Sequence, residues 1–228
     1  MPSHSGCAIG AAPERVHDIM KLGDMQVVGA PPAKLLKALA VISEALHPTF
    51  DAQRWIAHSG KTKESCVISS LAVRDFLFKI GFRDVEARPV FTVMRSLKDG
   101  TAVHSLGIGD ESPRGSKALP GRWVGHMAVV IPSAGYLVDT TLYPAVRPAW
   151  PWLPGMIALP LADEGNIVFG MKPLAGFQTP TGTGEAFDAI WLDQPANNLW
   201  RKGGDAARWR REAAVAALVA RFGSWRAD

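Results

Sequence analysis

Apolar side chains recur with the period of an α-helix in separate stretches of the chain. The first stretch predicts a helix over residues 32–46 that stops before Pro48. The second predicts a helix over residues 65–80, closed by Gly81 in a position that favours a left-handed cap. This second helix is apolar on nearly every side, so we expect it to be central and mostly buried. The third predicts a C-terminal helix over residues 204–225.

After the second helix the apolar positions alternate with polar ones, which is typical of β-strands. Residues 85–94 are the first predicted strand, and Pro89 indicates an edge strand or a bulge. Residues 123–131 and 136–141 predict a β-hairpin, joined by a Pro-Ser-Ala-Gly connection. Two further strands are predicted over residues 167–170 and 186–192.

Glycine, proline and polar residues interrupt these patterns and predict irregular chain. Residues 1–31 have weak periodicity and predict a loosely ordered N-terminal arm. Residues 95–121 predict a surface loop, which is either a lid or disordered. The Pro-rich residues 142–161 are expected to wrap the surface, and residues 176–184 to form another loop. No boundary divides the remainder, so residues 32–228 are expected to form one domain.

The composition is that of a folded protein: 228 residues, 47% hydrophobic and 20% charged. It excludes collagen, a coiled coil and wholesale disorder. A central helix followed by hairpins predicts an α+β fold in which that helix packs on an antiparallel sheet. No long apolar run and no secretory signal are visible, so we expect a cytoplasmic location and no membrane contact.

The formal net charge of +4 is too small to indicate a nucleic-acid partner. Basic residues and tryptophans do concentrate near the C-terminus. The apolar stripe of the helix over 204–225 favours docking on the core with a solvated basic face. The alternative is an acidic or nucleic-acid partner, whose binding would depend on salt and be abolished by removing residues 201–228.

Two cysteines, Cys7 and Cys66, form neither a disulfide scaffold nor a structural zinc site. One of them is therefore a candidate for chemistry. A thiol reacts as the thiolate, and because its ordinary pKa is near ~8.5 it needs help from a helix amino terminus or an imidazolium. Ser65 is a plausible N-cap, which places Cys66 at the first position of its helix.

The predicted hairpin places an imidazole and a carboxylate on one face. With an even-numbered loop, position 128 opposes position 139, so His126 lies diagonal to Asp139 at roughly 7–8 Å between backbones. Asp139 can then hold one ring nitrogen of His126 while the other nitrogen faces Cys66. This is the nucleophile, base and orienting acid of triad catalysis.

Each member of the triad has an ordinary alternative: a buried core cysteine, a structural histidine and an aspartate that caps a turn. Their joint order, on elements that suit each role, favours catalysis. Trp123 and His104 are candidates to contact substrate, although packing and plain surface exposure are the respective alternatives. Trp150 and Trp152 are further candidates to line a cleft.

Sequence segments around these residues resemble the transglutaminase-like branch of the papain-fold cysteine enzymes over about residues 60–145. The segments that carry the resemblance are Ser65-Cys66-Val67-Ile68-Ser69-Ser70-Leu71-Ala72, Val85-Glu86-Ala87-Arg88, Gly125-His126-Met127-Ala128-Val129-Val130 and Leu137-Val138-Asp139-Thr140-Thr141. The resemblance implies a papain-like or transglutaminase-like core with Cys66 as nucleophile, His126 as base and Asp139 as its partner. Members include peptidases, amidases, deamidases, acyltransferases and cross-linking enzymes, and the resemblance does not choose among them.

We therefore expect a cysteine-dependent acyl-transfer enzyme that acts on a peptide, protein or amide through a thioester and needs no cofactor. The Cys66 N–H is the expected first oxyanion donor, with Gln53 or His58 as weak candidates for the second. Two alternatives stay open. One is a non-catalytic module that binds a peptide or protein on the same fold. The other is a zinc site of Cys66, His126, Asp139 and His104.

Overall fold

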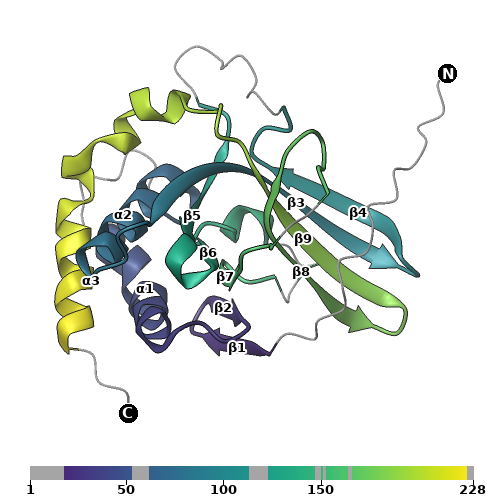
Figure 1. Cartoon of the computed structure of the whole chain (residues 1–228), viewed down its shortest axis with the longest axis horizontal. Helices are drawn as coiled ribbons and strands as arrows, with labels where there is room; N and C mark the ends of the chain where they lie inside the picture. Colours follow the sequence, from purple (N-terminus) through teal and green to yellow (C-terminus); the bar gives the residue numbers. More distant parts are fainter. Residues whose placement is uncertain are drawn as a thin grey trace.

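The computed structural model describes residues 18–52, 62–112, 123–146, 150, 153–163 and 166–224, and the fold in these ranges is α+β as expected. Its helices are α1 (Ala33–Asp51), α2 (Cys66–Lys79) and α3 (Glu212–Ser224). The strands are β1 (Ile19–Leu22), β2 (Met25–Val28), β3 (Glu86–Lys98), β4 (Thr101–Ile108), β5 (His126–Ile131), β6 (Tyr136–Asp139), β7 (Met156–Pro160), β8 (Pro173–Gly182) and β9 (Glu185–Asp193). They form one curled sheet in which β2 and β7 are the parallel pair and the other pairs are antiparallel (Figure 1).

The strand order is β1-β2-β7-β6-β5-β3-β9-β8, and β4 also pairs with β3. The long strand β3 organises this sheet because Val90 pairs with His126 of β5 on one edge and with Asp193 of β9 on the other. Up to Val90, β3 pairs along this edge with β5; from Thr92 onward the same edge pairs with β4. The end of β4 and the start of β5 therefore meet beside Val90.

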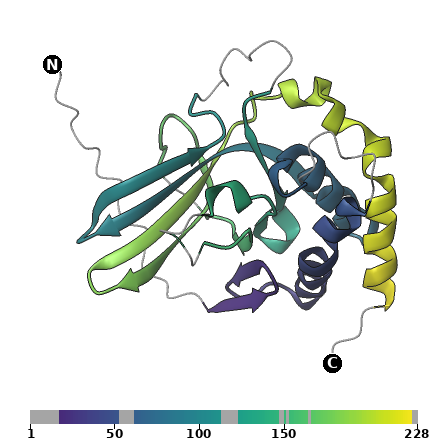
Figure 2. The same ribbon diagram turned by 180° about the vertical axis from the view of Figure 1, so that it is seen from behind.

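The two faces of the sheet bury different cores. The three helices cover one face, where residues such as Phe76, Leu39 and Val129 form the larger core. The concave face encloses a second core that includes Trp191 and Phe187. Seen from behind, the helices stand on one side of the molecule and the β3–β4 and β8–β9 hairpins project on the other (Figure 2). None of the described helices combines the length and apolar character needed to span a bilayer.

Helix α2 is central, as its apolar composition predicted, and it ends where expected. Gly81 follows it with a φ of +107°, and Phe82 donates its backbone N–H to the carbonyl of Leu77 at 3.0 Å. Glycine adopts this positive φ without the steric cost of a β-carbon. The sequence therefore fixes both the position and the end of the helix that begins at Cys66.

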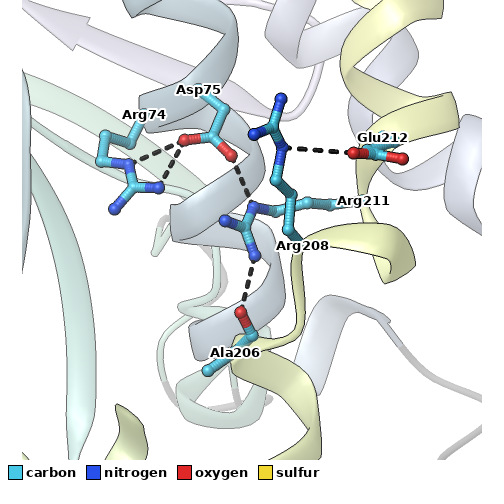
Figure 3. A network of polar contacts seen from close by, with 6 residues as sticks. All are labelled: Arg74, Asp75, Ala206, Arg208, Arg211 and Glu212. Atoms are coloured by element: carbon cyan, nitrogen blue, oxygen red, sulfur yellow. Dashed lines mark hydrogen bonds and ion pairs between the residues drawn. The ribbon is translucent and has the colours of Figure 1, made fainter.

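The C-terminal helix docks on the core, with Val215 and Leu218 buried. Its basic residues are only partly solvated, because Arg211 is buried and donates to Asp75 of α2 at 2.6 Å and to the carbonyl of Ala206 at 2.8 Å (Figure 3). Helix α3 is shorter than predicted. Short 3₁₀ turns occupy much of the chain between Leu199 and Arg210.

Several predictions of irregular chain were wrong. Of the N-terminal arm predicted over residues 1–31, the described part forms β1 and β2, while residues 1–17 lie outside the described ranges. Residues 95–112 of the predicted surface loop end β3 and form β4. The predicted loop over residues 176–184 is mainly the β8–β9 hairpin, and β7 lies within the predicted wrap over residues 142–161.

Both proline signals were misread. Pro48 lies inside α1, which continues to Asp51 because Phe50 buries its ring in the core. Pro89 lies in an interior strand, where its carbonyl accepts from the N–H of Gln194 just beyond the last paired residue of β9. The missing N–H of Pro89 faces the same edge, so the pairing of β3 with β5 loses no hydrogen bond. The strand predicted over residues 167–170 is a turn with an isolated bridge.

Candidate active site

Cys66 is the first residue of α2, and its half-buried sulfur lies 3.9 Å from the carbonyl oxygen of Gly125. Ser65 occupies the N-cap position as predicted, but its hydroxyl donates to Asp205 at 3.1 Å and does not cap the helix. Among the described residues no other side chain caps this end either. The free N–H groups of the first turn and the helix dipole therefore favour a negative charge near this end of α2, where the sulfur lies.

His126 begins β5, and its Nε2 lies 2.6 Å from Oδ2 of Asp139 at the end of β6. The hairpin register agrees with the prediction, since Val129 pairs with Val138. Nε2 is bonded to Asp139, which leaves the other ring nitrogen for Cys66, and the proximity of Cys66 is one of the causes that raise the pKa of His126. The structure therefore brings the three predicted residues together in series.

The carboxylate of Asp139 is fully buried and accepts two more hydrogen bonds. Trp191 of β9 donates its indole N–H to Oδ2 at 2.8 Å, and the backbone N–H of Thr141 donates to Oδ1 at 3.0 Å. The sequence analysis missed Trp191. Its position in an apolar predicted strand could have indicated this role, because the indole N–H of a buried tryptophan requires an acceptor in the core.

The electrostatics of this pair favour charge on both partners. Burial of the His126 ring opposes its charged form, but the charge and hydrogen bond of Asp139, with the contact from Cys66, raise the pKa of His126 to about 10. Burial likewise opposes ionisation of Asp139, yet His126, Trp191 and Thr141 together lower the pKa of its carboxyl.

Trp123, predicted to contact substrate, lies beside the site. It shares a small apolar cluster with Cys66, Met127 and Trp200, and its indole N–H donates to Oδ1 of Asn197 at 2.6 Å. Gly125 makes room for this ring, because a β-carbon there would lie 2.2 Å from Cζ2 of Trp123. A glycine immediately before His126 thus lets the indole approach the site.

Two amides that the sequence analysis missed hold two segments that precede His126 in the chain. The Nε2 group of Gln194 donates to the carbonyl of Ser112 at 2.8 Å and also to that of Asp110. The Nδ2 group of Asn197 donates to the carbonyl of Val124 at 3.1 Å. Gln194 and Asn197 belong to one turn after β9, and no local sequence pattern distinguishes them from surface amides.

Gly109 brings the end of β4 against the histidine. Its φ is +102°, and a β-carbon there would lie 3.1 Å from the backbone nitrogen and 3.2 Å from Cβ of His126. This close approach requires glycine on steric grounds as well as for its backbone conformation.

The structure does not bring His104, the other residue predicted to contact substrate, to the triad. His104 lies exposed on β4, opposite Ser96, at ~16 Å from Gly109 along a strand that rises ~3.3 Å per residue. The sequence analysis placed His104 in a surface loop over residues 95–121, whereas the residue lies on β4. Without His104 the proposed zinc set loses a ligand, and the described residues contain no cluster suited to a metal.

Of the other candidates, the structure describes Trp150. Trp150 is buried in the concave core, edge-on to Phe187 with ring centroids 5.7 Å apart. The remaining candidates, Cys7, Gln53, His58 and Trp152, lie outside the described residues.

Comparisons of the chain with protein-family models, with curated proteins and with solved structures found no match.

Proposed function

We propose that this protein is a cysteine-dependent acyl-transfer enzyme with Cys66, His126 and Asp139 as its catalytic triad. The observation that carries the proposal is the buried pair of Asp139 and His126 beside the half-buried Cys66 at the first position of α2. A structural histidine needs neither an aspartate held by three donors nor a thiol on its other face. Triads are identified by such geometry and not by sequence position.

The chemistry follows from the placement of the atoms. The Cys66 thiolate attacks an acyl carbon, a C–S bond forms, and the carbonyl oxygen becomes an oxyanion facing the Cys66 backbone N–H. His126 gives its proton to the leaving amine as the C–N bond breaks, which leaves a thioester. Water or a second amine, deprotonated by His126, then attacks the thioester and releases Cys66. The acceptor decides between hydrolysis and transfer.

The proposed fold is the transglutaminase-like branch of the papain fold. Its support is the nucleophile-bearing helix packed on a mainly antiparallel sheet, with histidine and aspartate on neighbouring strands. The proposed substrates are peptides, proteins or other amides, and Trp123 is the proposed apolar wall of the acyl site.

The decisive test is the reactivity of the thiol at about pH 6 in the full chain, followed by peptide mapping. We expect iodoacetamide to modify Cys66 at least about tenfold faster than free cysteine, because a catalytic cysteine is activated by its neighbours. His126→Gln removes this advantage, while His104→Gln is the matched control and retains it. Labelling no faster than free cysteine, or labelling mainly at Cys7, would contradict the proposal and favour a non-catalytic binding module.

Turnover is tested with a panel of peptide amides and amine acceptors. We expect acyl release or transfer by the wild-type protein and none by Cys66→Ala. Equal turnover in both proteins would place the activity elsewhere.

A further inference from the structure

A second histidine, His47 of α1, is buried behind the triad and is only 3% exposed. Its Nε2 lies 2.9 Å from the carbonyl oxygen of Thr140, and its Nδ1 lies 3.2 Å from Oγ1 of Thr62. Both ring nitrogens therefore have polar partners, on segments that lie far apart in the sequence. The mechanism above assigns His47 no role.

Each partner of His47 is attached to one end of the triad. The carbonyl of Thr62 accepts from the N–H of Ser65 at 3.1 Å and from the hydroxyl of Ser69 at 3.1 Å, so Thr62 holds the amino end of α2. Thr140 directly follows Asp139 in the chain. One imidazole thus connects the turn that precedes Cys66 to the strand end that carries Asp139.

We propose that His47 is a positioning residue that fixes the separation between the sulfur of Cys66 and the carboxylate of Asp139. The role deepens the proposed function and rests on it. His47 touches neither substrate nor reacting atoms, and it acts through Thr62 and Thr140. A change of about 1 Å between catalytic groups is enough to cost a large part of a rate.

The donors and acceptors also make this connection sensitive to protonation. A carbonyl only accepts, so Nε2 of His47 carries a hydrogen, and Nδ1 of the neutral ring competes for the hydrogen of the Thr62 hydroxyl with Oδ1 of Asp51, 3.3 Å away. When the ring is protonated, Nδ1 becomes a donor to Oγ1 of Thr62, and the hydroxyl hydrogen is left to Asp51 alone. Acid therefore reverses one of the two hydrogen bonds that connect the ends of the site.

The surroundings of His47 hold it neutral near pH 7. Burial is the main cause of its lowered pKa, and the charge of Lys63 adds to it, while the hydrogen bond to Thr140 and the carboxylates of Asp51 and Asp24 oppose it. The ring of Tyr143 packs edge-on to His47, with centroids 5.3 Å apart. The reversal at Thr62 is thus expected only at acidic pH.

The test is an NMR titration of the His126 ring in the full-length protein, which reports the triad geometry whether or not the protein turns over a substrate. His47→Leu removes both hydrogen bonds, and we expect the pKa of His126 to fall by about one pH unit as Asp139 and Cys66 move apart. His47→Gln places an amide N–H near Nε2, so it should retain most of the wild-type value by rescuing the bond to Thr140. Ser43→Ala, which alters the contact of α1 with Leu22, is the control and should leave His126 unchanged.

Thr62→Val provides a second route if His47→Leu does not fold. It removes only the hydroxyl, and we expect a smaller fall in the pKa of His126, together with loss of any acid limb below about pH 6 in the labelling rate of Cys66. A folded His47→Leu or Thr62→Val protein whose His126 titrates like the wild type would overturn the positioning role. Failure of the proposed function is distinct, because it would appear in the wild-type protein as slow labelling of Cys66 and no turnover.

Discussion

Trp191 donates its indole N–H to the same carboxylate oxygen of Asp139 that contacts His126. The donor–acceptor distances are 2.8 Å for Trp191 and 2.6 Å for His126. Strand β9 thereby reaches across the concave core to the end of β6, although the two strands are not neighbours in the sheet. The orientation of the acid depends on this contact as well as on the hairpin that carries it.

Replacing Trp191 with Phe is expected to raise the pKa of Asp139, because the charged carboxylate loses a donor, and to loosen the orientation of the carboxylate toward His126. The labelling rate of Cys66 at pH 6 should fall by about threefold to tenfold, and stability by about 1–3 kcal/mol. Stopped-flow alkylation and urea denaturation measure the two effects. Trp150→Phe makes the same ring change in the same core, and an equal loss of labelling in that variant would argue against a specific role for Trp191.

Replacing Asp139 with Asn removes the charge that raises the pKa of His126. A carboxamide also offers an N–H where Nε2 of the imidazole needs an acceptor. It therefore disfavours the tautomer with the hydrogen on Nε2, which leaves the other ring nitrogen free to accept a proton from the thiol. We expect turnover to fall by about 10²-fold or more, with Cys66 labelling at pH 6 approaching that of free cysteine. Retention of the wild-type rate by a folded Asp139→Asn protein would show that the carboxylate is structural.

Folding stability should vary with pH in a way that reports this pair. The raised pKa of His126, about 10, contributes stability that is fully present below its ordinary pKa of ~6.5 and is lost as pH rises through about 10. The lowered pKa of Asp139 contributes stability present above ~3.9 and lost as pH falls through its folded value. Urea denaturation between pH 5 and 10 should show a steeper alkaline decline for wild type than for His126→Gln. Parallel curves for the two proteins would contradict the assignment.

The placement of Cys66, His126 and Asp139 could be predicted from sequence because each residue lies on an element with a strong local signal. Apolar periodicity identified the helix that begins at Cys66, and alternation with a short turn identified the hairpin of His126 and Asp139. The hairpin register then followed from the length of the turn, since the side chains of a strand alternate between its faces.

The rest of the fold depends on contacts that local patterns do not encode. Strand β4 is exposed along most of its length and therefore lacks the apolar alternation that would identify it. Strand β8 contains Gly176 and Pro180, which suggested a loop, but pairing with β9 keeps it extended. The same limit applies to His47 and Gln194, because their partners lie far away in the sequence.

The anchor of α3 on α2 provides a test of stability separate from the chemistry. Arg211 and Asp75 have side chains 6% and 24% exposed, whereas Arg208 and Glu212 are 78% and 60% exposed (Figure 3). Arg211→Met should cost about 1–3 kcal/mol, since it removes a largely buried pair and the bond to Ala206. Arg208→Met should cost less than about 0.5 kcal/mol. Urea denaturation measures the free energy of unfolding of both variants. A similar decrease in the two would show that the buried pair stabilises the protein no more than the exposed pair does.

Gly125 tests whether Trp123 forms a wall of the site. The added methyl group of Gly125→Ala would collide with the indole, and we expect the ring to move and KM for apolar acyl substrates to rise by about threefold or more. Gly223→Ala on α3, where a β-carbon meets nothing within 4 Å, is the control for the same added methyl group. Because the cost comes from the clash, adding Trp123→Ala to Gly125→Ala should cause little further loss, so the two substitutions should be strongly non-additive in a double-mutant cycle. Simple additivity of the two changes would show that the indole and the glycine act independently, and Trp123 would then have no place in the acyl site.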